Sequence, residues 1–189
     1  MKKILALALL ASAAIATPAL AQSASASGTV AVTGTVAGKC TAITPITGTI
    51  TLGELANSGG TIISGFTNVT GTLTRSFTVI CTSSNASITV SSTNLVNSAD
   101  ATTANGYTGT VHYTSTLTAQ KAGGGADASA VYTSADALPT ATTVSLADRL
   151  KNAANNVTVT VSNGTTTNAT DLLKAGTYNS TITITVAPV

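Results

Sequence analysis

The feature that most constrains the fold of this chain is the alternation of apolar residues with Thr and Ser. It recurs in separate stretches, among them "TLTRSFTVICT", "NNVTVTVSN" and "STITITVAPV". A period of two places the apolar side chains on one face of an extended strand. Short stretches of this kind between turn signals such as "NSGG" are typical of an antiparallel β-sandwich. We therefore predict an all-β domain.

The same alternation predicts where the strands lie. We expect a first strand at Gly28–Lys39 and a second at Cys40–Leu55 that is interrupted near Pro45. Gln120–Ala130 is predicted to be a Gly-rich loop, and Ser145–Asn156 either one helical turn or a polar loop. The residues predicted to point inward are Leu73, Phe77, Val79, Ile88, Val90, Val111, Tyr113, Leu117, Val157, Val159, Val161, Tyr178, Ile182, Ile184 and Val186.

Residues 1–21 have the pattern of a secretory signal peptide. Lys2 and Lys3 precede a short apolar run, and Ala19-Leu20-Ala21 has the form of a cleavage site. The run is short for a membrane span, so we expect an exported chain with no membrane insertion. Without Lys2 and Lys3, six basic and six acidic residues remain out of the 8 and 6 of the whole chain.

Charged residues form only 7% of the chain, where about 25% is usual. The sequence has no basic patch that would indicate nucleic-acid binding and no polybasic run that would indicate binding to anionic lipid. A surface with so few charges protects poorly against association, so we expect the chain to associate.

The two cysteines, Cys40 and Cys81, favour a disulfide, because the chain is predicted to be exported. Two free thiols are an alternative. A metal pair that recruits His112 is another, although a closed zinc site usually needs four ligands.

Residues that could carry catalysis are few and dispersed. His112 is predicted to face outward as a solvated residue, and general acid–base catalysis needs titratable groups that converge. We predict that the chain is not an enzyme and expect no cofactor and no metal. A glycan-binding face is disfavoured because aromatic residues are scarce, with only Tyr107 and Tyr132 as candidates for exposure. The acidic residues lie mostly in predicted loops: Glu54, Asp100, Asp127, Asp136, Asp148 and Asp171.

The first predicted strand has a glycine in the middle of its apolar face, where Val30, Val32, Gly34 and Val36 follow one another. Two interpretations are open. The strand belongs to its own sheet and Gly34 marks a bulge or bend. Alternatively, it is donated to an unpaired edge of another molecule, where a glycine fits a shallow position.

The N-terminal pattern resembles that of chaperone–usher pilus subunits. Their donor segment has the form G-x-V-x-x-x-G-x-V, which Gly28 to Val36 matches, and Cys40 and Cys81 take the places of the family's two cysteines. At the other end, Gly176 is the fourteenth residue from the C-terminus and Tyr178 follows it, as is common in pilins. The ending "AGTYNSTITITV" is similar to spore-coat-U-type domains of the archaic branch, whereas Pro188 departs from the family's usual aromatic residue.

The resemblance implies an immunoglobulin-like sandwich that lacks its last strand. Residues 40–189 would form this single domain, and residues 22–39 a leader and donor strand. The implied acceptor groove is bordered by Gly176, Tyr178, Ile182, Ile184 and Val186.

The function implied by the resemblance is that of a structural subunit of a bacterial surface fibre, assembled by donor-strand exchange. Its partners would be neighbouring copies, a periplasmic chaperone and an outer-membrane usher. Two alternatives stay open. One is a secreted coat or surface protein whose first strand completes its own sheet. The other is an adhesive module of the same fold that binds a receptor on a host or another surface.

Overall fold

The computed structural model describes residues 28–135 and 140–189, so the predicted signal peptide and Asp136 lie outside the described residues. The chain divides between Gly34 and Thr35 into two units. In the first unit, Gly28–Gly34 are exposed and belong to no strand. Every strand of the described residues lies in the second unit, Thr35–Val189, together with one 3-10 turn, η1 (Ser64–Phe66).

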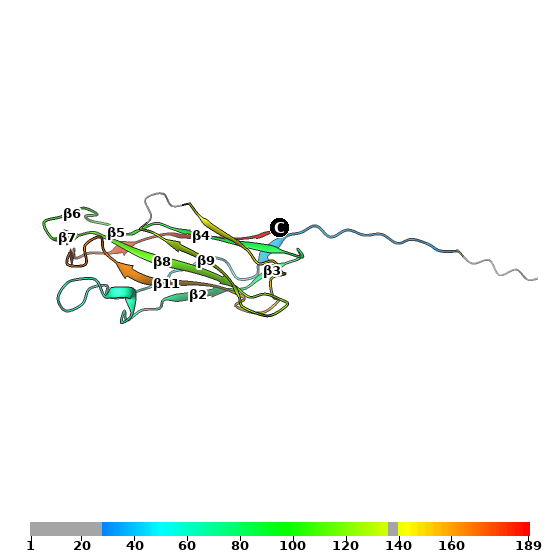
Figure 1. Cartoon of the computed structure of the whole chain (residues 1–189), viewed down its shortest axis with the longest axis horizontal. Coiled ribbons are helices and arrows are strands. Elements are labelled where there is room, and N and C mark those ends of the chain that lie inside the picture. Colours follow the sequence, from blue (N-terminus) through cyan, green and yellow to red (C-terminus); the bar gives the residue numbers. More distant parts are fainter. Residues whose placement is uncertain (1–27, 136–139) are drawn as a thin grey trace, which may run out of the picture. The chain divides into compact units, whose positions relative to one another are not determined.

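The second unit is built from antiparallel sheets (Figure 1). The larger sheet has the strand order β13-β5-β8-β11-β2, with β9 also paired to β8, and a second has the order β10-β4-β14. Among the described strands, only β12 and β7 pair in parallel. The strands are β1 (Cys40–Ala42), β2 (Thr74–Phe77), β3 (Val79–Cys81), β4 (Ala86–Ser92), β5 (Leu95–Asn97), β6 (Thr103–Ala104), β7 (Tyr107–Thr108), β8 (Thr110–Ala119), β9 (Ala128–Thr133), β10 (Thr142–Ser145), β11 (Val157–Thr165), β12 (Leu172–Leu173), β13 (Tyr178–Asn179) and β14 (Ile182–Pro188).

The core lies between these two sheets. Ile88 of β4 packs in one buried cluster with Leu117 of β8 and Val157 of β11, and all three have 0% of their surface exposed. Burial alternates along β4 and along most of β11, because every second side chain faces the other sheet. The predicted all-β, antiparallel architecture is therefore confirmed, and the shared core is consistent with a β-sandwich.

The domain has two distinct ends. At the disulfide end, β1 pairs with β3, Asn156 joins the loop 146–156 to Val79 of β3, and Lys121 of the loop 120–127 bridges to Leu150. At the opposite end lie β6, β7 and β12. A second buried cluster fills this half of the core and includes Phe66, Val111 and Tyr113. We use the names disulfide end and opposite end below.

The predicted second strand is mostly wrong. Only Cys40–Ala42 pairs, with β3, and the rest of Cys40–Leu55 is irregular. Pro45 has no N–H to donate to a ladder, and Gly48 and Gly53 have positive φ angles of 141° and 80° that interrupt an extended strand. The predicted first strand is also absent, because none of Gly28–Lys39 is assigned to a strand.

Other expectations about side chains and loops need correction too. Tyr132 is buried, with 4% of its surface exposed, because it faces the core from β9, whereas Tyr107 is exposed as expected. The predicted loop Gln120–Ala130 already contains the start of β9. Ser145–Asn156 contains no helical turn, and its Leu146 and Leu150 are buried, so it is not a wholly polar loop.

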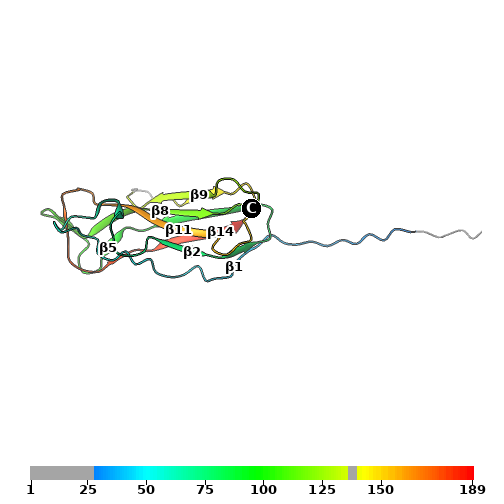
Figure 2. The same ribbon diagram turned by 90° about the horizontal axis from the view of Figure 1, so that it is seen from below.

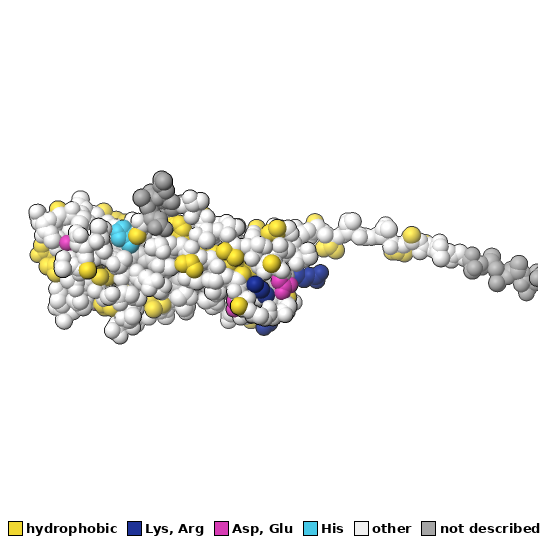
Figure 3. Space-filling view, in the orientation of Figure 1, with side chains coloured by type: hydrophobic (Ala, Val, Ile, Leu, Met, Phe, Trp, Pro, Cys, Tyr) yellow, Lys and Arg dark blue, Asp and Glu magenta, His cyan; other side chains and the backbone are white. Residues whose placement is uncertain are grey.

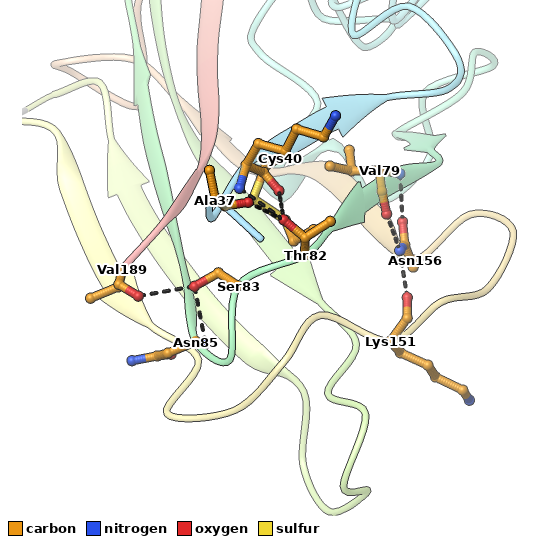
Figure 4. Close-up of a disulfide and its surroundings, with 11 residues drawn as sticks. Ala37, Cys40, Val79, Thr82, Ser83, Asn85, Lys151, Asn156 and Val189 are labelled. Atoms are coloured by element: carbon orange, nitrogen blue, oxygen red, sulfur yellow. Dashed lines mark hydrogen bonds between the residues drawn. A yellow bond between two sulfur atoms is a disulfide. The ribbon is translucent and has the colours of Figure 1, made fainter. Parts of the chain in front are cut away.

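The predicted disulfide between Cys40 and Cys81 is confirmed (Figure 4). The two residues are direct partners in the β1–β3 pair. Beside them, Thr82 donates its N–H to the Lys39 carbonyl (2.9 Å) and its hydroxyl to the Ala37 carbonyl (2.9 Å). The disulfide and the Thr82 hydrogen bonds therefore hold the chain in place where it enters the domain.

Asn156 fastens the loop 146–156 to β3 from inside the protein (Figure 4). Only 1% of its surface is exposed. Its side-chain amide donates to the carbonyls of Val79 (2.6 Å) and Lys151 (2.6 Å), and its side-chain oxygen accepts from the Val79 N–H (2.9 Å). Buried main-chain groups need such partners, since water cannot replace them.

Asn156→Ala is expected to lower the free energy of unfolding by about 3 kcal/mol, because it leaves the buried N–H and C=O of Val79 without partners. Urea denaturation measures the loss. The matched control is Asn152→Ala, an exposed residue of the same loop, which should change stability by less than about 0.5 kcal/mol. Equal effects at both positions would contradict this role for Asn156.

Candidate functional site

A groove of about 980 Å³ is the candidate functional site of the domain. Its lining includes Phe77 of β2 and Ile184 of β14, which are the last strands of the two sheets and can be followed in Figure 2. Side chains of the core, among them Leu95, Tyr113 and Val161, also line it. The groove therefore gives access to apolar core side chains between two strand edges.

The ladder between β14 and β4 shows which main-chain groups of β14 face its partner. The Thr181 carbonyl accepts from the Thr93 N–H (3.0 Å), and the Val189 N–H donates to the Asn85 carbonyl (3.1 Å). In an antiparallel pair, the groups that face the partner belong to alternate residues. The odd-numbered residues from 181 to 189 therefore direct their N–H and C=O groups toward β4.

The even-numbered residues of β14 consequently direct their main-chain groups away from β4. Among the described strands β4 is the one partner of β14, so the N–H and C=O groups of Ile182, Ile184 and Val186 lie along an unpaired edge. Pro188 continues this set but has no N–H, so the donors of the edge end at Val186. The edge therefore offers hydrogen-bonding groups, as any unpaired edge of a sheet does.

One wall of the groove is the irregular chain Ile46–Ala56. Within the described part of the chain, no residue of Pro45–Ile50 forms a main-chain hydrogen bond with another main-chain group. The Arg75 side chain holds this wall against β2, since its Nε donates to the Thr47 carbonyl (3.3 Å) and a Cβ at Gly48 would collide with its guanidinium. The wall up to Ile50 is therefore held by side-chain contacts, whereas the carbonyls of Thr51, Leu52 and Leu55 accept main-chain hydrogen bonds.

Gly176 forms part of the lining near the opposite end, and the structure explains why a glycine stands there. Its φ is 147°, and a Cβ would lie 2.7 Å from both the amide nitrogen and the oxygen of Asn97. Asn97, 2% exposed, donates to the carbonyls of Lys174 (3.1 Å) and Ala175 (3.2 Å). Tyr178 donates to the same Lys174 carbonyl (2.9 Å). These bonds shape the turn that leads into β14.

Tyr113 is a core residue of the groove lining that carries a polar group. Its hydroxyl lies 2.6 Å from the Ser180 hydroxyl, which in turn donates to the Thr93 carbonyl (2.7 Å). Burial raises the pKa of the Tyr113 hydroxyl. This chain of hydrogen bonds links the core to the start of β14, and its hydroxyl groups serve structure, since both hydroxyls have partners.

The structure brings four of the five predicted groove residues together. Gly176, Tyr178, Ile182 and Ile184 line the groove, whereas Val186 lies outside the lining and packs on the core from the end of β14. Sequence reasoning missed the wall Ile46–Ala56 and the contributions of Leu95 and Arg75. The alternation in this stretch predicts a strand, but the structure has an irregular wall there, so the pattern did not indicate its place in the groove.

The predicted donor residues are exposed. The exposed fractions of Val30, Val32 and Val36 are 90%, 93% and 83%. Gly34 is not among the glycines of positive φ in the described residues, so its own backbone would accept another residue. The donor role of these four residues and the acceptor role of the groove stay predictions.

His112 faces outward from β8 as predicted, between the buried Val111 and Tyr113, but it is only partly exposed. Its ring nitrogens lie 3.0 Å from the Asn94 side-chain oxygen and 3.2 Å from the Thr167 hydroxyl, and burial lowers its pKa. Within residues 28–135 and 140–189, no three His, Cys, Asp or Glu side chains are placed to hold a metal ion. In the same residues, no helix has the length and apolar character that a membrane crossing requires.

No family model matches the chain, and neither a curated protein nor a solved structure matches it.

Proposed function

We propose that the chain is a structural subunit of a bacterial surface fibre in which one copy completes the sandwich of the next. Of the segment Gly28–Lys39, the part up to Val36 would lie in the groove of a neighbouring copy as the strand that its domain lacks, while Thr82 holds Ala37 and Lys39 in their own domain. The observation that carries the proposal is the unpaired edge of Ile182, Ile184 and Val186 beside a groove that reaches the core. A β-strand from another copy would supply both main-chain partners and apolar side chains.

The chemistry of the segment supports this pairing. In an extended strand, Val30, Val32 and Val36 would lie on one face, and all three are exposed in the single copy. Burying three valines contributes about 5 to 9 kcal/mol before the cost of ordering the segment. An isolated segment has no edge to pair with, which accounts for the absence of a strand at Gly28–Lys39.

Gly34 has a role in the proposed complex that it lacks in the single copy. Because its φ is not in the left-handed region, its own backbone does not need a glycine. In the groove it would allow the main chain of the segment to approach the side chains beneath it. The repeated contact, segment into groove, is heterologous and does not close, so copies would continue into a fibre.

Export and assembly of such a subunit involve two further partners. An exported subunit with an open groove needs protection before assembly, and the proposed protectors are a periplasmic chaperone and an outer-membrane usher. The end product is a fibre at the cell surface. No chemical step is involved, so the proposed function requires neither catalysis nor a cofactor.

The deciding experiment compares the mature chain with a version that lacks Gln22–Lys39, both expressed to the periplasm. We expect the full chain alone to form a ladder of oligomers on denaturing gels that disappears on boiling. A stable monomeric full chain beside an unfolded truncated chain would contradict the proposal, because the segment would then complete its own domain. Retention of glycan or matrix by the monomer would instead favour an adhesive module.

A further inference from the structure

The charged side chains of the second unit lie mainly at its two ends, and the net charges of the two ends have opposite signs. At the disulfide end, Figure 3 shows blue and magenta side chains gathered, while the flank in view is nearly free of charge. The described charged residues of this end are four basic residues and two acidic residues, Asp127 and Asp148. The end therefore has an excess of two positive charges. The basic ones are Lys39, Lys121, Arg149 and Lys151.

The opposite end carries the reverse excess. Its described charged residues are one basic residue, Lys174, and three acidic residues, Glu54, Asp100 and Asp171. The opposite end therefore has an excess of two negative charges. Lys174 is occupied by Asp100, with 2.7 Å between Nζ and Oδ2, and its hydrogen bond lowers the pKa of that carboxyl. His112 adds no positive charge near pH 7, because burial lowers its pKa.

Glu54 is the acidic side chain of this end that is both exposed and part of the groove lining. One of its oxygens accepts from the Ala56 N–H (2.9 Å), and no described cation lies within ion-pair distance of it. Glu54 therefore places a negative charge without a described ion-pair partner in the groove lining. The two cations of that lining have other partners, since Lys174 pairs with Asp100 and Arg75 donates to the Thr47 carbonyl.

Lys39 carries the opposite charge to Glu54 and lies at the disulfide end. It is exposed, it directly precedes the disulfide, and its main chain is held by Thr82 at the disulfide end. Three residues of extended chain, about 10 Å, separate it from Val36. If Val36 lies in a groove, Lys39 stands close to the mouth of that groove.

We propose that the basic disulfide end of one copy docks on the acidic opposite end of the copy that receives its strand, with Lys39 facing Glu54. This inference rests on the proposed function and adds a body-to-body contact to it. The reverse arrangement would bring two basic ends together, which opposes association. Opposite charges at the two ends also steer copies into head-to-tail encounters.

The test is a charge exchange in the purified mature chain, with oligomer growth followed by light scattering and unboiled gels. At low salt, Lys39→Glu and Glu54→Lys are each expected to slow growth about 5- to 10-fold. The double variant, which exchanges the two charges, should return to within about twofold of the wild type. At about 1 M salt, where the Debye length is about 3 Å, all four proteins should grow at similar rates.

Two controls make the outcome decisive. Val131→Glu and Val131→Lys place charges on the exposed flank of β9, away from both ends, and should not change the growth rate. Circular dichroism checks that every variant is folded, and Lys39→Gln and Glu54→Gln give graded effects with less perturbation.

The experiments test the end-to-end contact separately from the donor strand. If the wild type grows through its segment but the single variants match it, or the double variant does not recover, the end-to-end contact is wrong. If the chain without Gln22–Lys39 grows as well as the wild type, the donor strand itself is wrong.

Discussion

Val32→Arg is expected to abolish fibres while the domain stays folded. Val32 is the middle valine of the exposed apolar face and has 93% of its surface exposed in the single copy. In the proposed complex, the arginine would have to enter a groove lined by apolar core side chains, where Glu54 is the one acidic residue of the described lining and is already exposed at the opposite end. Burying an unpaired charge costs several kcal/mol, which exceeds what one valine contributes.

The measurement is fibre yield by electron microscopy and the heat-labile ladder, with the melting temperature of the monomer as the test of folding. The matched control is Thr33→Arg, which adds the same side chain one residue later. Because side chains alternate along a strand, this arginine would point away from the groove and fibres should form at near-normal yield. Normal fibres from Val32→Arg would show that the segment is not the donor strand.

Removal of the disulfide, by Cys40→Ser together with Cys81→Ser, is expected to lower the free energy of unfolding by about 4 kcal/mol. The bond joins residues 41 apart in sequence, and the loop-entropy relation gives this magnitude for such a separation. Because a domain of ordinary stability has about 5 to 15 kcal/mol in total, the loss is a large fraction of it.

Guanidinium denaturation of the double variant beside the wild type measures this loss. Treatment of the unfolded wild type with a reductant, followed by refolding under reducing conditions, should reproduce it, while the variant should not respond to reductant. A variant as stable as the oxidised wild type would mean that the β1–β3 pair and the Thr82 hydrogen bonds hold the chain entry without the bond.

How much of the fold the sequence predicts depends on the range of the interaction. Val157, Val159 and Val161 are buried, and Thr158 and Thr160 between them face outward, as the alternation predicts. The pattern is local, since it depends only on the geometry of one strand. The cysteine pair was also predictable, because a chain with two cysteines and a predicted signal peptide has one possible intramolecular disulfide.

The candidate site was predictable in part. The resemblance to pilus subunits implies Gly176 and Tyr178 as groove residues, and the alternation predicts that Ile182 and Ile184 face inward. The spacing could not reveal why a glycine is needed at 176, because the reason is the Asn97 side chain, 79 positions earlier in the chain. The opposing wall lies within the predicted strand Cys40–Leu55, of which only Cys40–Ala42 pairs, so its alternation did not show that it forms an irregular wall.

The sequence by itself thus determined which strand faces are apolar, which cysteines pair and how few charges the chain carries. The tertiary structure alone decided that β14 ends its sheet, that Asn156 satisfies Val79 across 77 residues, and that charges of opposite sign lie at opposite ends. The physical reason is that alternation records whether a side chain is buried, whereas edges, buried polar partners and charge separation depend on which distant segments become neighbours.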